Sequence, residues 1–274
     1  MLELMDRLLW PWGRALGVDQ CVRVNNAELY AQARGCQKEV HTWGKANGVD
    51  FECTKESFHV ISRSEPDGDV FKQLGVSFDT QLLMDVEISG LVAEASWKLA
   101  TMLRTRRFFN DMEIIRHFKA HVLSFIEYRT AAIYHAATSV LAPLEAIHAR
   151  LLRAANMTPV EALLHCRLAP LHTRRDMAML GLIHRSLLGR GPPHFKKLFR
   201  LQDPGGERGR TRLAQARHRF QLEEFEGTQE YVCRSVLGLI RVYNLLPVQI
   251  VEASATVKDF ICFARACTAQ GVEG

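Results

Sequence analysis

The sequence lacks any apolar run of about 18 residues, the length that a membrane-spanning helix needs, although 47% of its residues are hydrophobic. It also lacks a Cys-x-x-Cys pair, and its seven cysteines are an odd number. Neither a disulfide scaffold nor a zinc ribbon is therefore indicated. We expect no membrane span, and we expect reduced thiols in an intracellular compartment.

Several enzyme motifs are also missing. The 274 residues contain no GxxxxGK[ST], no GxGxxG and no GxSxG. His117 and His121 are four residues apart and could lie on one helix face, and His165 adjoins Cys166. Because neither pair has a third ligand at a suitable spacing, we predict no metal site from them.

The hydrophobic pattern predicts a mainly α fold with a small antiparallel β-hairpin, an α+β chain. Residues 26–46 read as a helix that Asn26 could cap. Residues 51–63 and 70–79 are rich in β-forming residues and predict the two strands of the hairpin. Apolar stripes at helical spacing follow. The first comprises Ile88, Val92, Ala95, Leu99 and Leu103; the second comprises Met112, Ile115, Phe118, Val122, Phe125 and Ile126.

Further helices are predicted near 142–155, 158–166, 171–188 and 193–200, and a last helical section over about 228–270, interrupted near Pro247. We expect Trp43 and Trp97 to be core residues. The helical pattern over 121–136 is interrupted by Glu127, Tyr128 and Arg129. Polar residues are unusual inside a helix that only fills a core, so these three need an explanation.

The positive charge is concentrated in two windows. Residues 98–119 hold six basic and two acidic residues, and residues 185–219 hold ten basic and two acidic residues. The net charge of the whole chain is only +5. Such clustering is typical of proteins that contact nucleic-acid phosphates, although a solvated basic face gives the same pattern.

A series of segments then carries a family resemblance. The segments are, in order, HTWGKANGVDF, TKESFHVI, FKQLGVSFD, SWKLATMLRTRRFF, FKAHVLSFIEYRTAAIYHA, LAPLEAIHARLLRAA and LAPLHTRRDMAMLGLIHRSLLGRGPPHF. This order resembles the C-terminal part of reverse transcriptases of non-LTR retrotransposons, which are RNA-directed DNA polymerases. The resemblance covers about residues 27–200, and more weakly 234–247.

The resemblance implies a partial palm over 27–80 and a helical, thumb-like bundle over 81–200. Within the palm, Lys55 is similar to the family's lysine, and FKQLGVSFD resembles the strand-turn called the primer grip. Gly75 suits a tight turn there. Family-like structural roles also fall on Glu127 and Tyr128 in a thumb helix. Arg174 and Arg175 would form an ion-pair cluster with Asp176 at a helix start.

One family feature is missing from these residues. The family's palm holds two Mg²⁺ ions on carboxylates that include an aromatic-x-Asp-Asp sequence, and this should precede residue 27 by a short distance. Residues 1–26, which match nothing in the family, contain only the separated acids Glu3, Asp6 and Asp19. We therefore expect a truncated, family-like fragment without catalytic or metal-binding residues, without a cofactor, and without polymerase activity on its own.

The retained function that we expect is nonspecific binding of an RNA or DNA duplex through its backbone phosphates. The candidate residues are Lys72, Lys98, Arg104, Arg106, Arg107, Lys119, Arg208, Arg210 and Arg212. The last three lie in an expected mobile basic linker, 201–226, which precedes a C-terminal helical segment, 227–274.

Two alternatives stay open. The chain could be a helical protein-interaction module, with a partner at an exposed palm face. It could also be active only after assembly with a separate palm chain.

Overall fold

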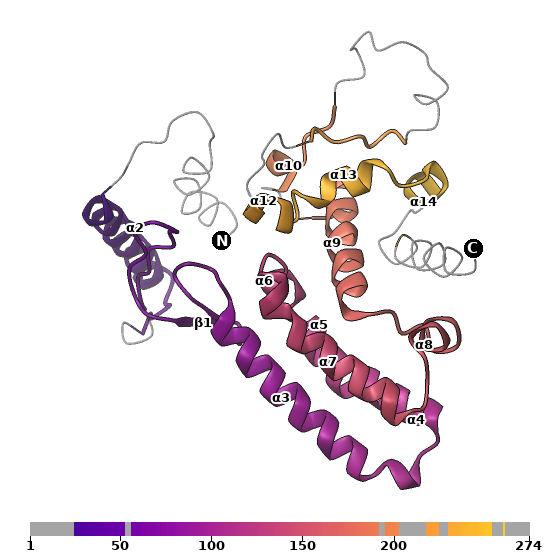
Figure 1. Ribbon diagram of the computed structural model, residues 1–274. Helices are drawn as coiled ribbons and strands as arrows, with labels where there is room; N and C mark the ends of the chain where they lie inside the picture. Colours follow the sequence, from indigo (N-terminus) through magenta and orange to yellow (C-terminus); the bar gives the residue numbers. More distant parts are fainter. Residues whose placement is uncertain are drawn as a thin grey trace. The chain divides into compact units, whose positions relative to one another are not determined.

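The computed structural model describes residues 25–52, 56–191, 195–202, 218–224, 230–253 and 260. These residues fall into two units (Figure 1). The smaller unit contains the described residues up to 72 together with 78–82, and the larger unit contains 73–77 and the described residues from 83 onward. The described part is mainly helical with a two-stranded antiparallel sheet, which confirms the predicted fold class.

The smaller unit is built around helix α2 (Asn26–Ala46). The helix is capped by Asn25 rather than by the predicted Asn26, because the Asn25 side chain accepts a hydrogen bond from the backbone N–H of Ala27 at 3.2 Å. Near its end, the chain returns so closely that a Cβ on Gly44 would lie 2.4 Å from the Phe51 ring. Glycine is therefore required at position 44.

The β-hairpin lies elsewhere than predicted. The segment 51–63 forms no strand among its described residues, and only an isolated bridge pairs Val60 with Asp67. Both strands instead lie within the segment predicted as one: β1 is Phe71–Gln73 and β2 is Val76–Phe78. They are joined by Leu74 and Gly75, whose φ angles are +49° and +82°. Positive φ at both central residues is typical of the tight type I′ turn, which agrees with the turn predicted at Gly75.

The larger unit begins with a layer of helices. Its elements are α3 (Asp85–Arg104), the 3₁₀ turn η2 (Arg106–Phe108), α4 (Asp111–Phe118), the π-helical turn η3 (Lys119–Leu123), α5 (Ser124–Glu127), α6 (Thr130–Ile133) and α7 (Thr138–Ala154). The predicted stripe on α3 is buried at Ile88, Ala95 and Leu99, and this helix packs most extensively against α7 (Figure 1).

The second half of the larger unit continues with shorter helices. They are α8 (Pro159–Cys166), α9 (Leu171–Leu187), α10 (Phe195–Leu198), α12 (Glu230–Arg234), α13 (Leu239–Asn244) and α14 (Val248–Ala253). The helices predicted near 142–155, 158–166 and 171–188 are confirmed as α7, α8 and α9. The predicted last section is broken into three short helices where it is described, and Pro247 separates the last two.

A second apolar core joins α9 to α13 and α14. Ile183 of α9 is fully buried there together with Tyr243 and Phe260. The buried Asn244 side chain pairs with the backbone of Leu222, because its amide donates to the Leu222 carbonyl and accepts from the Leu222 N–H, each at 2.9 Å. This bidentate contact holds the segment 218–224 on the core.

Candidate nucleic-acid interface

The corner between α3 and α4 carries three of the predicted basic residues, Arg104, Arg106 and Arg107. Helix α3 ends at Arg104, and the next residues tighten into the 3₁₀ turn. Helix α4 starts behind Asn110, which forms a capping box with Glu113. The corner between α3 and α4 lies at one end of the helical layer (Figure 1), and the three arginines belong to it because Arg104 ends α3 and Arg106 and Arg107 form the 3₁₀ turn.

The three arginines differ in what they contact. Arg106 lies 2.7 Å from a carboxylate oxygen of Asp111, and this salt bridge compensates its charge. Arg107 is exposed, with its guanidinium 4.7 Å from the centre of the Phe108 ring. Arg104 is also exposed. Arg104 and Arg107 are therefore better placed than Arg106 to contact a phosphate.

The two predicted lysines of this region are engaged within the protein. Lys98 pairs with Glu94 at 3.2 Å and lies 4.8 Å from the centre of the Phe125 ring. Lys119 donates a hydrogen bond to the backbone carbonyl of Cys166. Both ammonium groups thus have internal partners, which lowers their value as phosphate ligands.

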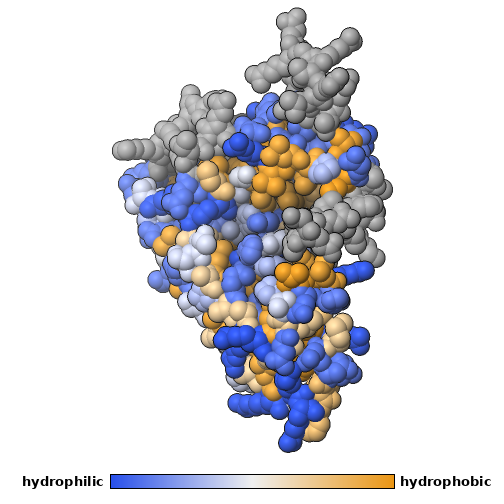
Figure 2. Space-filling view, turned by 45° about the vertical axis from the view of Figure 1, so that its right-hand side comes forward, coloured by the Kyte–Doolittle hydropathy of each residue, from blue (hydrophilic) through white to orange (hydrophobic). Residues whose placement is uncertain are grey.

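Exposed aromatic rings accompany the arginines. Trp97 is 65% exposed and Phe108 is 69% exposed. The prediction that Trp97 is a core residue is therefore wrong. Its position already indicated exposure, since it falls off the stripe of Ala95 and Leu99 on a helix with 3.6 residues per turn. Figure 2 shows the lower end of the molecule, where α3 passes into α4, as mainly hydrophilic with apolar side chains between the polar ones.

The other predicted basic residues are not part of this corner. Lys72 is exposed on β1 and belongs to the smaller unit. Arg208, Arg210 and Arg212 lie outside the described residues, as does Lys55. The predicted linker 201–226 is likewise described only at 201–202 and 218–224.

The Glu127-Tyr128-Arg129 sequence lies at the end of α5 and in the turn after it, not in the middle of a helix. Tyr128 donates from its hydroxyl to the carbonyl of Leu74 at 2.8 Å. Arg129 donates to the buried Glu87 carboxylate, which also accepts from the Ser77 N–H at 2.7 Å. Two of the three side chains therefore hold the 73–77 part of the hairpin, a role that spacing in the sequence does not reveal.

The third residue of that sequence contacts α9. Glu127 forms a salt bridge with Arg174. Arg175, also on α9, pairs with Glu145 of α7 at 3.0 Å, and its Nη1 atom is buried with no hydrogen-bond partner among the described atoms.

The neighbouring acid of α9, Asp176, accepts a hydrogen bond from the Tyr134 hydroxyl at 2.8 Å, and burial and this bond raise the pKa of Tyr134. The predicted local cluster at the start of α9 is therefore corrected: each of its three charged residues pairs with a different helix or turn.

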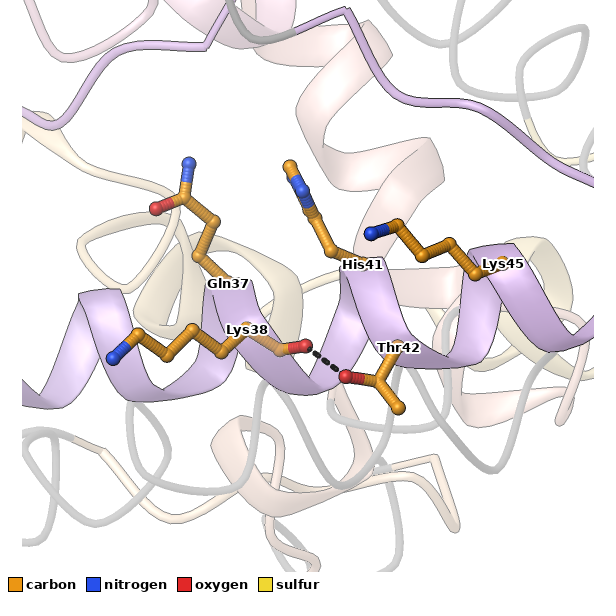
Figure 3. Close-up of a pocket in the computed structure, with 5 residues that line it drawn as sticks. All are labelled: Gln37, Lys38, His41, Thr42 and Lys45. Carbon is orange, nitrogen blue, oxygen red and sulfur yellow. Dashed lines mark hydrogen bonds between the residues drawn. The ribbon is translucent and has the colours of Figure 1, made fainter.

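A shallow, open hollow lies along α2 in the smaller unit (Figure 3). Gln37, His41 and Lys45 point to the same side of the helix, as their spacing of four predicts. Glu56 receives hydrogen bonds from Gln37 and His41, and these bonds lower the pKa of its carboxyl. Since His41 is bonded to this carboxylate and faces no Ser or Cys nucleophile in the hollow, the arrangement indicates a structural contact rather than nucleophilic catalysis.

In the described part of the chain, no group of three His, Cys, Asp or Glu residues could hold a metal ion. His117 and His121 stack with ring centres 6.0 Å apart and gain no third ligand of those types. None of the described helices combines the length and apolarity that crossing a bilayer requires.

Comparison with known proteins adds no relative: no family model, curated protein or solved structure matches this chain.

Proposed function

We propose that the chain is a palm-and-thumb-like segment of the non-LTR reverse-transcriptase type that binds RNA or DNA through backbone phosphates. The observation that carries the proposal is the corner of the larger unit, where exposed Arg104 and Arg107 lie near exposed Trp97 and Phe108 in the chain. Guanidinium groups bind phosphates well because their planar donors match the phosphate oxygens. The ordered motifs from residue 41 to residue 195 support the family assignment.

The affinity of this kind of binding depends on the salt concentration in a characteristic way. Each phosphate contact releases counterions, so the logarithm of the binding constant falls linearly with the logarithm of the salt concentration. The test is fluorescence anisotropy with a labelled primer–template duplex between about 50 and 200 mM salt, using several unrelated base sequences. We expect a steep fall with salt and the same affinity for every sequence. Binding that ignores salt would contradict the proposal, as would no binding at low salt.

The same proposal holds that these residues alone do not polymerise nucleotides. The 274 residues contain no aromatic-x-Asp-Asp sequence to hold two Mg²⁺ ions. A primer-extension assay with Mg²⁺ and nucleotides tests this directly. We expect no extension by the chain alone, and any extension that survives repurification would overturn this part of the proposal. Extension that needs an added palm chain would support the second alternative, an enzyme that is active only after assembly with a separate palm chain.

A second candidate function is a protein-interaction module. It is favoured by the exposed apolar side chains of the smaller unit: Val49, Phe51, Ile61 and Val70 are 38% to 49% exposed. Exposed apolar groups in one small unit are typical of a surface that a partner covers. Sizing chromatography coupled to light scattering separates the two functions, because a module of this kind assembles with itself or a partner at salt concentrations that abolish nucleic-acid binding.

A further inference from the structure

In the larger unit, two methionine sulfurs lie close to the Sγ atom of Cys166, and the three residues come from three different elements. Cys166 is the last residue of α8, Met112 lies in the first turn of α4, and Met157 lies in the loop between α7 and α8. The Cys166 Sγ atom lies 3.5 Å from Met112 Sδ and 4.0 Å from Met157 Sδ. We propose that these sulfurs form a binding site for a soft monovalent metal ion, Cu(I) being the ion that their chemistry fits.

The backbone at each of the three positions is fixed by its own helix terminus. Met157 follows Asn156, whose φ is +49°, and the Met157 N–H donates to the Leu152 carbonyl at 3.0 Å. This is the Schellman arrangement that ends a helix firmly. Met112 lies inside the capping box of α4.

Cys166 also lies at a helix end, as the last residue of α8. It precedes Arg167, whose φ is +51°, and the Leu168 N–H donates to the Ala162 carbonyl at 2.9 Å. The carbonyl of Cys166 itself accepts from Lys119. The three sulfurs are thus presented by a backbone that is already ordered, as a binding site requires.

The two distances from Cys166 are compatible with sulfur ligation of one ion. A thiolate–metal bond is about 2.3 Å long, so sulfurs around one ion in a trigonal plane lie about 4 Å apart. The separations of 3.5 Å and 4.0 Å from Cys166 are close to this value, and the two methionine side chains would complete the trigonal arrangement around the bound ion. Ordinary packing of sulfur-containing side chains also gives contacts of this length, so the affinity for metal must decide between the two.

The ligand types select the ion. One thiol and two thioethers are soft ligands, which favour Cu(I) over Mg²⁺, Ca²⁺ or Mn²⁺. Binding would release the thiol proton to solvent and form one sulfur–copper bond to the thiolate, with two dative bonds from the thioethers. The complex of a thiolate with a monovalent ion is neutral, so it avoids the cost of burying a net charge. Met112 is 49% exposed and Cys166 is 5% exposed, which gives the ion an entry from solvent past Met112.

The test uses the full chain under anaerobic, reducing conditions. Cu(I) is offered in competition with a chromogenic Cu(I) chelator such as bicinchoninate, and the fraction retained by the protein is read from the absorbance of the chelator complex. We expect one Cu(I) per chain to be withheld from the chelator at Cys166. Replacement Cys166→Ser should remove that one equivalent, and Met112→Leu and Met157→Leu should each weaken its retention about tenfold, the scale of losing one ligand or its support.

The controls distinguish a defined copper site from copper binding by other cysteines of the chain. Cys36→Ser removes a different cysteine, and Met179→Leu removes a buried methionine of the other core; both should leave retention unchanged. Met→Leu conserves volume, so the variants should fold, and thermal unfolding without Cu(I) checks this. Added Cu(I) should raise the melting temperature of the wild type and of both controls, raise it less in the two methionine variants, and leave that of Cys166→Ser unchanged. Equal retention by the wild type and Cys166→Ser would overturn the proposal, as would unchanged retention in both methionine variants.

Discussion

Arg129 donates from Nε to a carboxylate oxygen of Glu87 over 2.6 Å, and the two side chains are only 14% and 7% exposed. The guanidinium also lies 4.2 Å from the centre of the Phe125 ring and donates to the Phe125 carbonyl. Because the Ser77 N–H donates to the same Glu87 carboxylate, one buried ion pair connects α3, the turn after α5 and the hairpin.

Breaking this pair from one side should destabilise the larger unit strongly. Glu87→Ala or Arg129→Ala leaves an unpaired buried charge, and we expect each to lower the free energy of unfolding by about 3 kcal/mol. The double variant should lose much less than the sum of the two, because it leaves neither charge behind. Urea unfolding monitored by circular dichroism measures all three. The partly exposed pair of Lys98 and Glu94 is the control, and Glu94→Ala should cost less than about 1 kcal/mol.

The turn of the hairpin stores strain that one substitution should release. Leu74 has a φ of +49° and an 83% exposed side chain. Its left-handed backbone conformation therefore costs free energy that no burial of the side chain offsets. Asparagine tolerates this conformation and precedes glycine in the preferred type I′ turns. We expect Leu74→Asn to raise the free energy of unfolding by about 1 kcal/mol in the same urea assay.

A matched control for that variant is Leu83→Asn, at a 48% exposed leucine without positive φ. This change should bring no gain. If Leu74→Asn destabilises the chain instead, the left-handed backbone at position 74 stores no strain that asparagine can relieve.

The sequence correctly predicts those elements that are determined by the pattern of neighbouring residues. The stripe on α3 is buried as its spacing indicates, and α8 begins after Thr158, which forms a capping box with Glu161. The predicted hairpin is misplaced because β-forming residues in 51–63 show only that a strand is compatible there, whereas the Leu74-Gly75 turn determines where pairing occurs.

The contacts of Tyr128 and Arg129 could not be predicted in the same way. Tyr128 reaches Leu74 and Arg129 reaches Glu87, and both contacts join residues more than 40 positions apart in the chain. The periodic pattern of apolar residues in the sequence does not indicate which distant residues contact each other. The exposure of Trp97, by contrast, follows from the helical spacing, which outweighs the general tendency of large aromatic residues to be buried.

A pH dependence should follow from the buried imidazole of His148. Burial lowers the pKa of His148, a shift that Glu145 opposes and that Arg174 and His172 reinforce. The folded state therefore binds a proton less readily than the unfolded state, whose histidine titrates near about 6.5. Stability is unaffected well above that pH and falls as the pH drops below it. Burial lowers the pKa of His218 as well, so a residual slope of the same sign remains without His148.

The test is His148→Leu. The Nε2 atom of His148 is buried with no hydrogen-bond partner among the described atoms, so an apolar side chain should raise the unfolding free energy at pH 7.5 by about 1 kcal/mol. It should also reduce the loss of stability between pH 7.5 and pH 5.5. The exposed His165, replaced by glutamine, serves as the control and should keep the wild-type slope. An unchanged slope in His148→Leu would show that this histidine is not the titrating group.

The proposed interface makes a prediction that distinguishes phosphate contacts from ring contacts. Arg104→Ala and Arg107→Ala should each weaken duplex binding equally for all base sequences and should each reduce the salt dependence by about one phosphate contact. Trp97→Ala should leave the salt slope unchanged, because an indole carries no charge; if the ring stacks on unpaired bases, the loss should appear with single strands. Arg241 is exposed on α13, away from the corner, and Arg241→Ala should leave both affinity and slope unchanged. If all three arginine variants lose affinity alike, binding depends on net charge alone, and the corner of α3 and α4 has no special role.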